Sequence, residues 1–230
     1  MRGAAVFLAA LLAAPAGAEI VSARYGDPTT RYAHGVLGDD VEYGALVLHM
    51  GDGTRRRVVL PQTRVFEDTA PRLADLDGDG RAEVIAVESD LAQGARLSIY
   101  GPDGLIAATP FIGTPYRWLA PVGAADLDGD GWVEIAYVDR PHLARVLRIW
   151  RFKDGQFAEI AQADGVTNHR IGDEVISGGV RDCGTGPEMV LADPDWSRIV
   201  IARLRAGRVE ARSLARPATR DEFRAVLACR

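Results

Sequence analysis

Short apolar runs recur along the chain and alternate with turns that are rich in glycine and aspartate. Runs such as "AEVIAVES", "VEIAYVD" and "PEMVLAD" are each followed by a stretch of alternating apolar and polar residues that closes on a glycine, as in "ARLSIYGPDG" and "RIVIARLRAG". A period of two, β-branched residues and Asp-Gly turns are typical of strands joined in hairpins. The pattern therefore predicts an all-β chain of short antiparallel strands.

The strand pattern repeats with a period of about 50 residues. The stretch "PRLADLDGDGRAEVIAVESD" from Pro71 aligns with "PVGAADLDGDGWVEIAYVDR" from Pro121, and weaker copies lie at residues 20–40 and 176–195. Such a period is typical of propeller blades or solenoids. We expect residues 19–230 to form a single domain, a small β-propeller of about four four-stranded blades. The expected repeats are 20–70, 71–120, 121–175 and 176–216.

Only the C-terminal tail, residues 217–230, departs from the strand pattern. In this tail Thr219 is followed three residues later by Glu222, a spacing that caps the start of a helix. Phe223, Val226 and Leu227 then follow at helical spacing. We therefore expect a short C-terminal helix.

The first 18 residues, "MRGAAVFLAALLAAPAGA", have the features of a secretory signal peptide: one positive charge, an apolar stretch and small residues before a cleavage site at Ala18. We therefore expect an exported protein, periplasmic or extracellular. No later segment is long and apolar enough to span a membrane.

The two cysteines, Cys183 and Cys229, would enter an oxidising compartment after export. An even number of cysteines in an exported chain favours a disulfide between them, with two free thiols as the alternative. We expect this bond to tie the C-terminal helix to the fourth repeat.

Charge limits the class of partner. Cleavage would remove Arg2 and leave 26 basic against 32 acidic residues, a net charge of −6. This mildly acidic balance argues against nucleic acid as a partner. The sequence specifies no oligomeric state.

The motif "ADLDGDG" occurs at residues 74–80 and again at 125–131, and each copy places three carboxylates within five residues. Without a cation, such neighbours repel one another by about 1 to 4 kcal/mol per pair, depending on exposure. Carboxylates with backbone carbonyls form the all-oxygen shell that Ca²⁺ prefers. The expected ligands are Asp75, Asp77, Asp79, the Arg81 carbonyl and Glu83 in the first turn, and Asp126, Asp128, Asp130, the Trp132 carbonyl and Glu134 in the second.

Two other interpretations of this motif compete with a calcium turn. An EF-hand loop needs a glutamate at its twelfth position, where this chain has Ala86 and Tyr137, and the flanking segments alternate like strands. A solvated turn without metal is the second alternative, and two copies with the glutamate in register argue against it. We therefore expect about two Ca²⁺ ions with a structural role.

At these residues the chain resembles the FG-GAP or VCBS repeats of calcium-binding propellers of the integrin α-chain type. The resemblance covers residues 71–100 and 121–150 and is carried by "DLDGDGxxE". It implies a β-propeller with Ca²⁺ in the turn between the first and second strands of a blade. The first repeat has "YGDPTTRY" and the fourth "DCGTGPE", so the resemblance implies no calcium in those two.

The loops at the opposite ends of the strands carry a second group of polar residues, with one aspartate at nearly the same place in each repeat. The candidate ligand face consists of Asp39, Asp90, Asp139, Arg140, His142, Asp193, Trp196, Arg117, Trp118 and His169. Such a group fits a polar ligand or a partner's basic side chain. The alternative is that the acids cap strand ends and pair with nearby arginines.

Two classes of function are compatible with these features. The first is an exported, calcium-stabilised, non-catalytic binding or scaffold module for a protein or glycan partner. The second is a hydrolase or lyase acting on a polar polymer, with His142 or His169 and an acid such as Asp139 or Asp173 as general acid/base pair. We favour the first, because the chain has no nucleophile elbow, zinc-spaced cluster or P-loop. His34 is interpreted as a core residue of an apolar strand.

Overall fold

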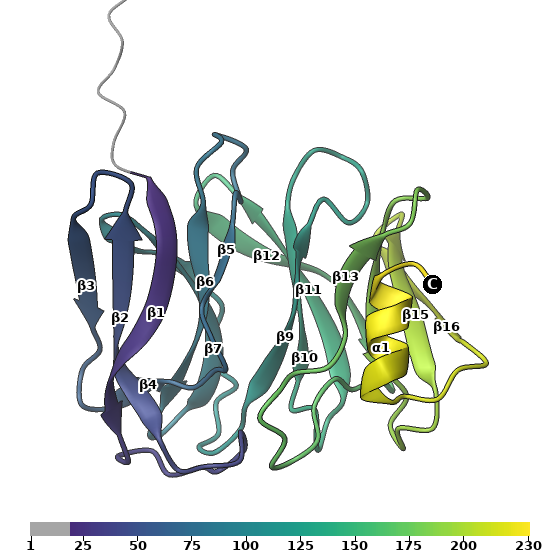
Figure 1. The fold of residues 1–230 in the computed structure, drawn as a ribbon, viewed down its shortest axis with the longest axis horizontal. Coiled ribbons are helices and arrows are strands. Elements are labelled where there is room, and N and C mark those ends of the chain that lie inside the picture. The colour runs from purple at the N-terminus through teal and green to yellow at the C-terminus, as the bar shows by residue number, and fades with distance from the viewer. Residues whose placement is uncertain (1–18) are drawn as a thin grey trace, which may run out of the picture.

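The computed structural model describes residues 19–230, so the predicted signal peptide lies outside the described residues. Within them, sixteen strands form three antiparallel sheets and one short helix follows the last strand, which confirms the all-β prediction (Figure 1). The strands follow one another in four groups of four, which we call the first to fourth repeats.

The bounds of the elements are as follows. The first repeat contains β1 (Ile20–Thr29), β2 (Glu42–Met50), β3 (Arg55–Val59) and β4 (Arg64–Phe66). The second contains β5 (Arg72–Ala74), β6 (Glu83–Asp90), β7 (Gly94–Gly101) and β8 (Gly104–Ala108). The third contains β9 (Leu119–Ala125), β10 (Glu134–Asp139), β11 (Val146–Lys153) and β12 (Gln156–Asp164). The fourth contains β13 (Gly179–Asp182), β14 (Pro187–Ala192), β15 (Ile199–Arg205) and β16 (Arg208–Ser213), and α1 (Arg220–Leu227) follows.

The third and fourth repeats are separate four-stranded meanders, each with its strands in sequence order. The second repeat has the same order but shares a sheet with the first. Strand β4 pairs with β2 through Phe66 and Tyr43, and with β6 through Arg64 and Asp90. The first two repeats therefore form one eight-stranded sheet instead of two blades.

The first repeat also departs from the others between its first two strands. Residues 20–40 align with an inner and a central strand of the second repeat, but the chain leaves the sheet after Thr29 and residues 30–41 form a loop. Gly35 and Gly38 in this loop have φ angles of 65° and 96°, which a strand excludes. His34 therefore lies in a loop, and its interpretation as part of an apolar strand was wrong.

Each central strand is buried on both faces, which explains why these runs are apolar throughout. In β6, Ile85 and Val87 pack against the third repeat, whereas Val84 and Ala86 pack against the first. Successive side chains of a strand point to opposite faces, so a strand between two neighbouring layers needs apolar residues at every position. Strands β10 and β14 are shared between two core clusters in the same way.

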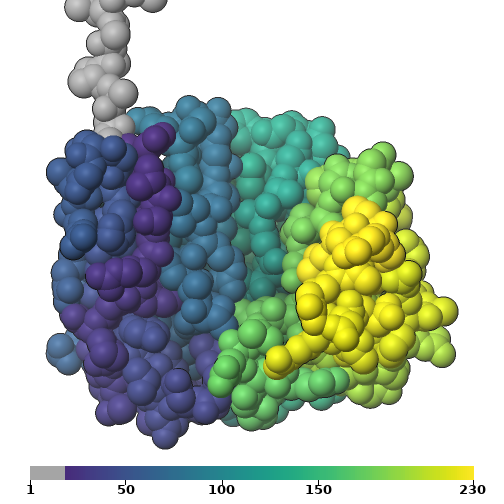
Figure 2. All heavy atoms as spheres, in the orientation of Figure 1, coloured from purple at the N-terminus to yellow at the C-terminus, as the bar shows by residue number. Residues whose placement is uncertain are grey.

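The four repeats lie in a row, with adjacent layers packed face to face. Figure 2 shows the first repeat at the purple end and the fourth, with the helix, at the yellow end. Within residues 19–230 no strand of the first repeat pairs with a strand of the fourth, so the ring closure that defines a propeller is not seen. At one end the loop after β1 does reach the loop before β13, where the Gly172 N–H donates to the Val36 carbonyl at 3.2 Å.

Helix α1 covers the outer face of the fourth repeat. The Thr219 side chain accepts a hydrogen bond from the Glu222 N–H at 3.3 Å, as the capping pattern predicts, and Phe223 and Val226 are buried against β14 and β15. The predicted disulfide joins Cys183, in the turn before β14, to Cys229 directly after the helix. The apolar face that a further repeat would otherwise cover is thus closed by a helix that the disulfide holds in place.

Removing the disulfide should lower the stability of the chain. The two cysteines are 46 residues apart, and closing a loop of that length is worth about 4 kcal/mol in the chain-entropy model. We expect the Cys183→Ser/Cys229→Ser variant to lose on the order of this free energy of unfolding, measured by urea titration. An unchanged free energy of unfolding in the double variant would contradict the role given to this bond.

Candidate functional site

The first acidic turn connects β5 to β6 in the second repeat, and the second acidic turn connects β9 to β10 in the third repeat. In the first, the Asp75 carboxylate accepts hydrogen bonds from the N–H groups of Gly78 at 2.8 Å and Gly80 at 2.9 Å. Both glycines have left-handed φ angles, 79° and 84°, which explains the glycine at these positions. The second turn repeats this geometry around Asp126.

Each turn is closed by the glutamate that begins the central strand. The Leu76 N–H donates to Glu83 at 2.9 Å, and the Leu127 N–H donates to Glu134 at 2.8 Å. Both leucine side chains are buried, and so are both glutamates. The leucine anchors the turn to the core while the glutamate holds its backbone, so the remaining carboxylates are gathered above the strand ends.

The turns bring carboxylate oxygens within 4.8 Å of one another. The first acidic cluster contains Asp75, Asp77 and Glu83, and the second contains Asp126, Asp128 and Glu134. The third aspartate of each motif lies outside its cluster: Asp79 binds the Arg81 guanidinium, with 2.8 Å to Nε, and Asp130 lies 2.7 Å from the Arg151 guanidinium. Four of the six predicted aspartates and both glutamates are therefore brought together.

The two clusters differ in their basic neighbours. Arg151 belongs to β11, and its side chain reaches the second turn. There the guanidinium contacts Glu134 at 2.7 Å, Asp128 at 2.8 Å and Asp130 at 2.7 Å. Among the described residues, no arginine or lysine forms an ion pair with a member of the first cluster. The second cluster thus already contains a cation from its own chain.

The pKa values of the strand-starting glutamates follow this difference. Burial raises the pKa of Glu83, and the neighbouring aspartates raise it further. Burial also raises the pKa of Glu134, but the Arg151 guanidinium opposes this effect. Burial alone would raise the pKa of Glu188 at the same place in the fourth repeat, yet two arginines hold it below its ordinary value.

The donor set of the first cluster fits Ca²⁺. It offers three carboxylate groups within reach of one ion and no guanidinium in contact with them. The second cluster offers the same oxygens with Arg151 among them. The turn of the fourth repeat keeps one aspartate, Asp182, which accepts the N–H groups of Gly184 and Gly186, and its Glu188 is bound by Arg181 and Arg203.

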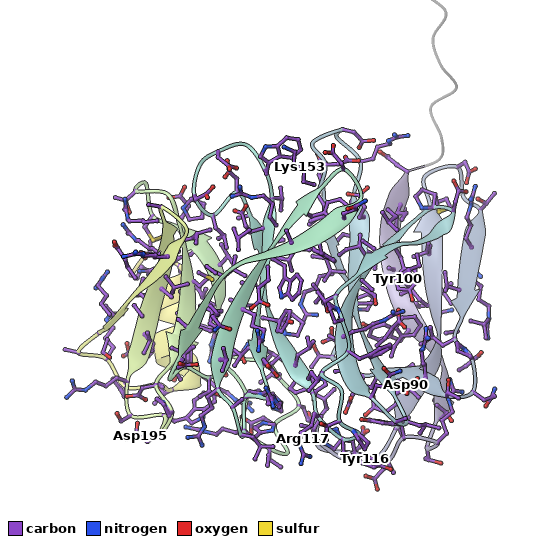
Figure 3. The ribbon with its side chains drawn as sticks, turned by 180° about the vertical axis from the view of Figure 1, so that it is seen from behind. Asp90, Tyr100, Tyr116, Arg117, Lys153 and Asp195 are labelled. Atoms are coloured by element: carbon purple, nitrogen blue, oxygen red, sulfur yellow. A yellow bond between two sulfur atoms is a disulfide. The ribbon has the colours of Figure 1, made fainter. Side chains whose placement is uncertain are left out.

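A cavity of about 230 Å³ lies at the other end of the strands. Figure 3 shows Tyr116 and Arg117 at this end and Lys153, which lies over the Trp132 ring beside the second acidic turn, at the opposite end. The cavity is lined by His34, Val36, Tyr116, Arg117, Trp118, Arg140, Pro141, His142, Leu143 and Ile171. These residues come from loops of the first three repeats and from the loop before β13. The ionisable side chains of the lining are arginines and histidines, without a carboxylate.

His34 is held at the cavity by a buried carboxylate. Its Nδ1 lies 2.6 Å from the Glu67 carboxylate, and the Ser89 hydroxyl donates to the other oxygen of the same group. Burial raises the pKa of Glu67 and the contact with His34 opposes this shift, so Nδ1 and the Glu67 carboxyl group share one proton. The side chain of His34 is 19 % exposed and that of Glu67 is fully buried. Sequence reasoning missed this pair, since no motif links residues that are 33 positions apart.

Two further histidines form a hydrogen-bonded chain. His142 Nε2 lies 3.0 Å from His169 Nδ1, and His169 Nε2 lies 2.8 Å from the Asp173 carbonyl oxygen. The carbonyl can only accept, so His169 donates to it from Nε2 and accepts from His142 at Nδ1. Burial and the neighbouring His169 lower the pKa of His142 to about 4, and burial also lowers the pKa of His169. Both rings are therefore neutral at pH 7.

Trp118 connects these two parts of the cavity. Its indole N–H donates to the Glu67 carbonyl at 2.8 Å, and its ring stacks on His142 and meets the edge of His169. Trp118 is buried, so His142 and His169 lie against one rigid ring, and its indole N–H holds the backbone of Glu67, the partner of His34. Tyr116 belongs to the same loop, and its N–H donates to the Tyr32 hydroxyl at 2.9 Å.

Of the ten residues predicted for the ligand face, Arg117, Trp118, Arg140 and His142 line the cavity. His169 lies directly behind His142. The aspartates and Trp196 lie elsewhere, and Trp196 packs against Phe223 of the helix and under Arg170.

The aspartates of the predicted face are used within the fold. Asp39 and Asp90 each accept the backbone N–H two residues further along, and Asp193 accepts the N–H of Arg198 and the hydroxyl of Ser197. Asp139 is buried and binds the guanidinium groups of Arg140 and Arg148. These are the contacts that the capping and ion-pairing alternative predicts.

The acid/base pairs named from the sequence are not formed. His169 contacts the backbone carbonyl of Asp173, not its carboxylate, and His142 contacts His169. Asp139 is bound by arginines. The histidine and carboxylate that do meet at the cavity are His34 and Glu67.

Comparison with known proteins agrees with the geometry of the turns. Residues 75–137, which span both acidic turns and the strands between them, match the family model of the FG-GAP-like repeat. This part of the chain is an FG-GAP-like repeat. The resemblance drawn from the "DLDGDG" motifs is thereby confirmed for residues 75–137.

Solved structures similar to the chain include two rhamnogalacturonan lyases. The exotype lyase YesX has a TM-score of 0.46 and 15 % sequence identity, over 73 % of this chain and 41 % of the lyase. The lyase YesW has a TM-score of 0.45 and 15 % identity, over 74 % of this chain and 42 % of the lyase. The chain thus spans about two fifths of the length of these lyases. No curated protein sequence matches the chain significantly, and no helix among residues 19–230 is long and apolar enough to cross a membrane.

The neutral state of His142 predicts an acid-dependent loss of stability. Its pKa in the folded chain, about 4, lies below the ordinary value of 6.5, so the unfolded chain binds the proton first as the pH falls. The free energy of unfolding should therefore decrease between pH 6.5 and 4 by about 2 kcal/mol more in the wild type than in His142→Gln. Urea titrations at both pH values measure this, with His49→Gln on β2 as control. Equal pH slopes in wild type and His142→Gln would show that this ring does not titrate on unfolding.

Proposed function

We propose that this chain is an exported, calcium-stabilised binding module of propeller type, without catalytic activity, that holds an acidic glycan in the cavity at the loop end. Calcium is bound at the acidic turns and maintains the sheet ends, while the ligand is bound at the opposite end. The observation that carries the proposal is the lining of the cavity, which combines arginines, histidines and aromatic rings without a carboxylate.

The lining of the cavity indicates the class of ligand. Arg117 is partly exposed, and its guanidinium donates within the chain to the Tyr116 carbonyl, which leaves further N–H groups for a ligand. Guanidinium groups bind carboxylates in a planar, two-bonded geometry. Tyr116 is 46 % exposed, and Leu143 and Ile171 at the same cavity are more exposed still. A sugar ring with a carboxylate presents an apolar face and a charged edge that suit this lining.

The calcium part of the proposal is supported by the FG-GAP-like repeat and by the first acidic cluster. An ion that binds only the folded chain stabilises it by about 2.7 kcal/mol when its concentration is a hundred times the Kd. Export would bring the protein into compartments where the predicted disulfide and calcium both persist.

Loss of one cluster ligand should lower stability only when calcium is present. Asp77→Ala removes a carboxylate from the first cluster, so in calcium its melting temperature should fall by several degrees relative to the wild type. In EGTA the two proteins should melt within about a degree of each other, because repulsion within the cluster also decreases. Asp103→Ala removes one charge from an exposed hairpin turn and serves as control. An equal fall in calcium and in EGTA would show that the turn acts without metal.

Binding to the cavity can be measured with oligogalacturonate as the probe and dextran oligomers as the neutral control. We expect Arg117→Ala to weaken oligogalacturonate binding by about tenfold or more, since a hydrogen bond to a charged group is lost. Arg55→Ala, on an exposed strand and without an ion pair among the described residues, should bind like the wild type. Equal binding by both variants, or equal binding of dextran, would contradict the proposal. Binding of polyglutamate in place of the sugar would indicate a protein partner.

A second candidate function, a hydrolase or lyase acting on a polar polymer, is favoured by the His34–Glu67 pair. A histidine oriented by a buried carboxylate and open to a cavity has the geometry of a general base. The binding experiment separates the two functions if reducing ends and unsaturated products are also measured. The binding module forms neither product, whereas an enzyme forms one that His34→Asn abolishes.

A further inference from the structure

One strand position lies opposite the strand-starting glutamate in each of three repeats. Pairing of Val84 with Tyr100 places Glu83 opposite Gly101. In the third repeat Glu134 pairs with Arg151. In the fourth, pairing of Met189 with Ala202 places Glu188 opposite Arg203. The residue facing the glutamate is therefore glycine, arginine and arginine in turn.

The fourth repeat shows what an arginine at this place does. Glu188 is buried, and its two carboxylate oxygens are bound by Arg203 at 2.7 Å and by Arg181 at 2.8 Å. The turn in front of it, "DCGTGPE", keeps one aspartate, Asp182, and lacks the two further aspartates of the motif. Here guanidinium groups supply all of the positive charge that the glutamate receives, and a metal is not needed.

The third repeat combines both arrangements. It keeps the full acidic motif, and it also has the arginine opposite the glutamate. Arg151 contacts three carboxylates of the turn, of which Asp128 and Glu134 belong to the second acidic cluster. In the second repeat Gly101 provides no side chain, so the first acidic cluster has no such partner.

We propose that Arg151 is the resident cation of the second acidic turn, so that of the two turns only the first binds Ca²⁺ tightly. This inference rests on the calcium part of the proposed function, and it replaces the expectation of about two Ca²⁺ ions drawn from the paired motifs. The residue opposite the glutamate, Gly101 in the second repeat and Arg151 in the third, then decides whether the turn uses a metal ion or an arginine.

The physical reason is competition for the same oxygens. A guanidinium that touches Asp128 and Glu134 occupies the positions from which these groups would coordinate an ion. Calcium has to displace the guanidinium from both carboxylates or bind beside its positive charge, and either lowers affinity. Arg151 is anchored by its place in β11, so it does not diffuse away as a solvent cation does.

The test is calcium binding to the full, oxidised chain by isothermal titration, with bound metal counted after gel filtration. The wild type should bind one Ca²⁺ tightly and any second ion at least about tenfold more weakly. Asp77→Asn should remove the tight ion, and Asp128→Asn should leave it in place. Arg151→Met, which keeps an unbranched side chain without the charge, should gain a second tight ion.

The reciprocal variant keeps the proposal testable if Arg151→Met does not fold. Gly101→Arg should remove the tight ion, because it places a guanidinium opposite Glu83. A Cβ at position 101 would meet the flexible end of Ile106 at 2.8 Å, so Gly101→Met controls for this crowding and should keep the ion.

Three results distinguish the possibilities. One tight ion in the wild type and two in Arg151→Met support the proposal. Two equally tight ions in the wild type, or no gain in Arg151→Met, overturn it while leaving calcium binding intact. No bound calcium in the wild type or in any variant overturns the calcium part of the proposed function together with this inference.

Discussion

A buried glutamate at the start of a central strand is the feature on which the acidic turns depend. Glu83, Glu134 and Glu188 are all buried, and a buried carboxylate is costly unless donors or cations compensate for it. In the second and third repeats one donor is the backbone N–H of a leucine whose side chain enters the core. The rest of the compensation comes from arginines of the adjacent strands in the third and fourth repeats, and we propose that it comes from a calcium ion in the second. On this proposal the same backbone plan is stabilised by different cations.

The layered packing separates the two ends of the molecule. Central strands that are apolar on both faces lock neighbouring repeats together, and helix α1 with its disulfide closes the last face. The strand ends are then free to carry different chemistry. Turns built around a spaced acidic motif occupy one end, and at the other end loops from several repeats meet at a cavity that His34, Trp118 and His142 line. Because these loops start from packed strands, the cavity lining is held in position without a dedicated scaffold.

The features that could be predicted from the sequence are those that depend on the spacing of residues close together in the chain. The acidic turns follow from "DLDGDGxxE", the helix from the capping pattern at Thr219, and the strands from their period of two. What it missed depends on pairs distant in the chain. Arg151 reaches Glu134 through strand register across 17 positions, and His34 meets Glu67 across 33. The repeat copy expected at residues 20–40 departs from the pattern for a local reason, since Gly35 and Gly38 lie in a loop with left-handed φ angles. The row of repeats without ring closure depends on how layers stack, which the repeat period does not encode.

Amide hydrogen exchange in the two turns, measured with saturating Ca²⁺ and with EGTA, tests directly whether the turns hold different cations. Residues 76–83 should exchange at least about tenfold more slowly in calcium, because the ion holds the turn closed in the folded state. Residues 127–134 should change little, because Arg151 already holds that turn. Equal slowing of both turns would contradict the assignment of different cations to them, and an unchanged first turn would contradict calcium binding there.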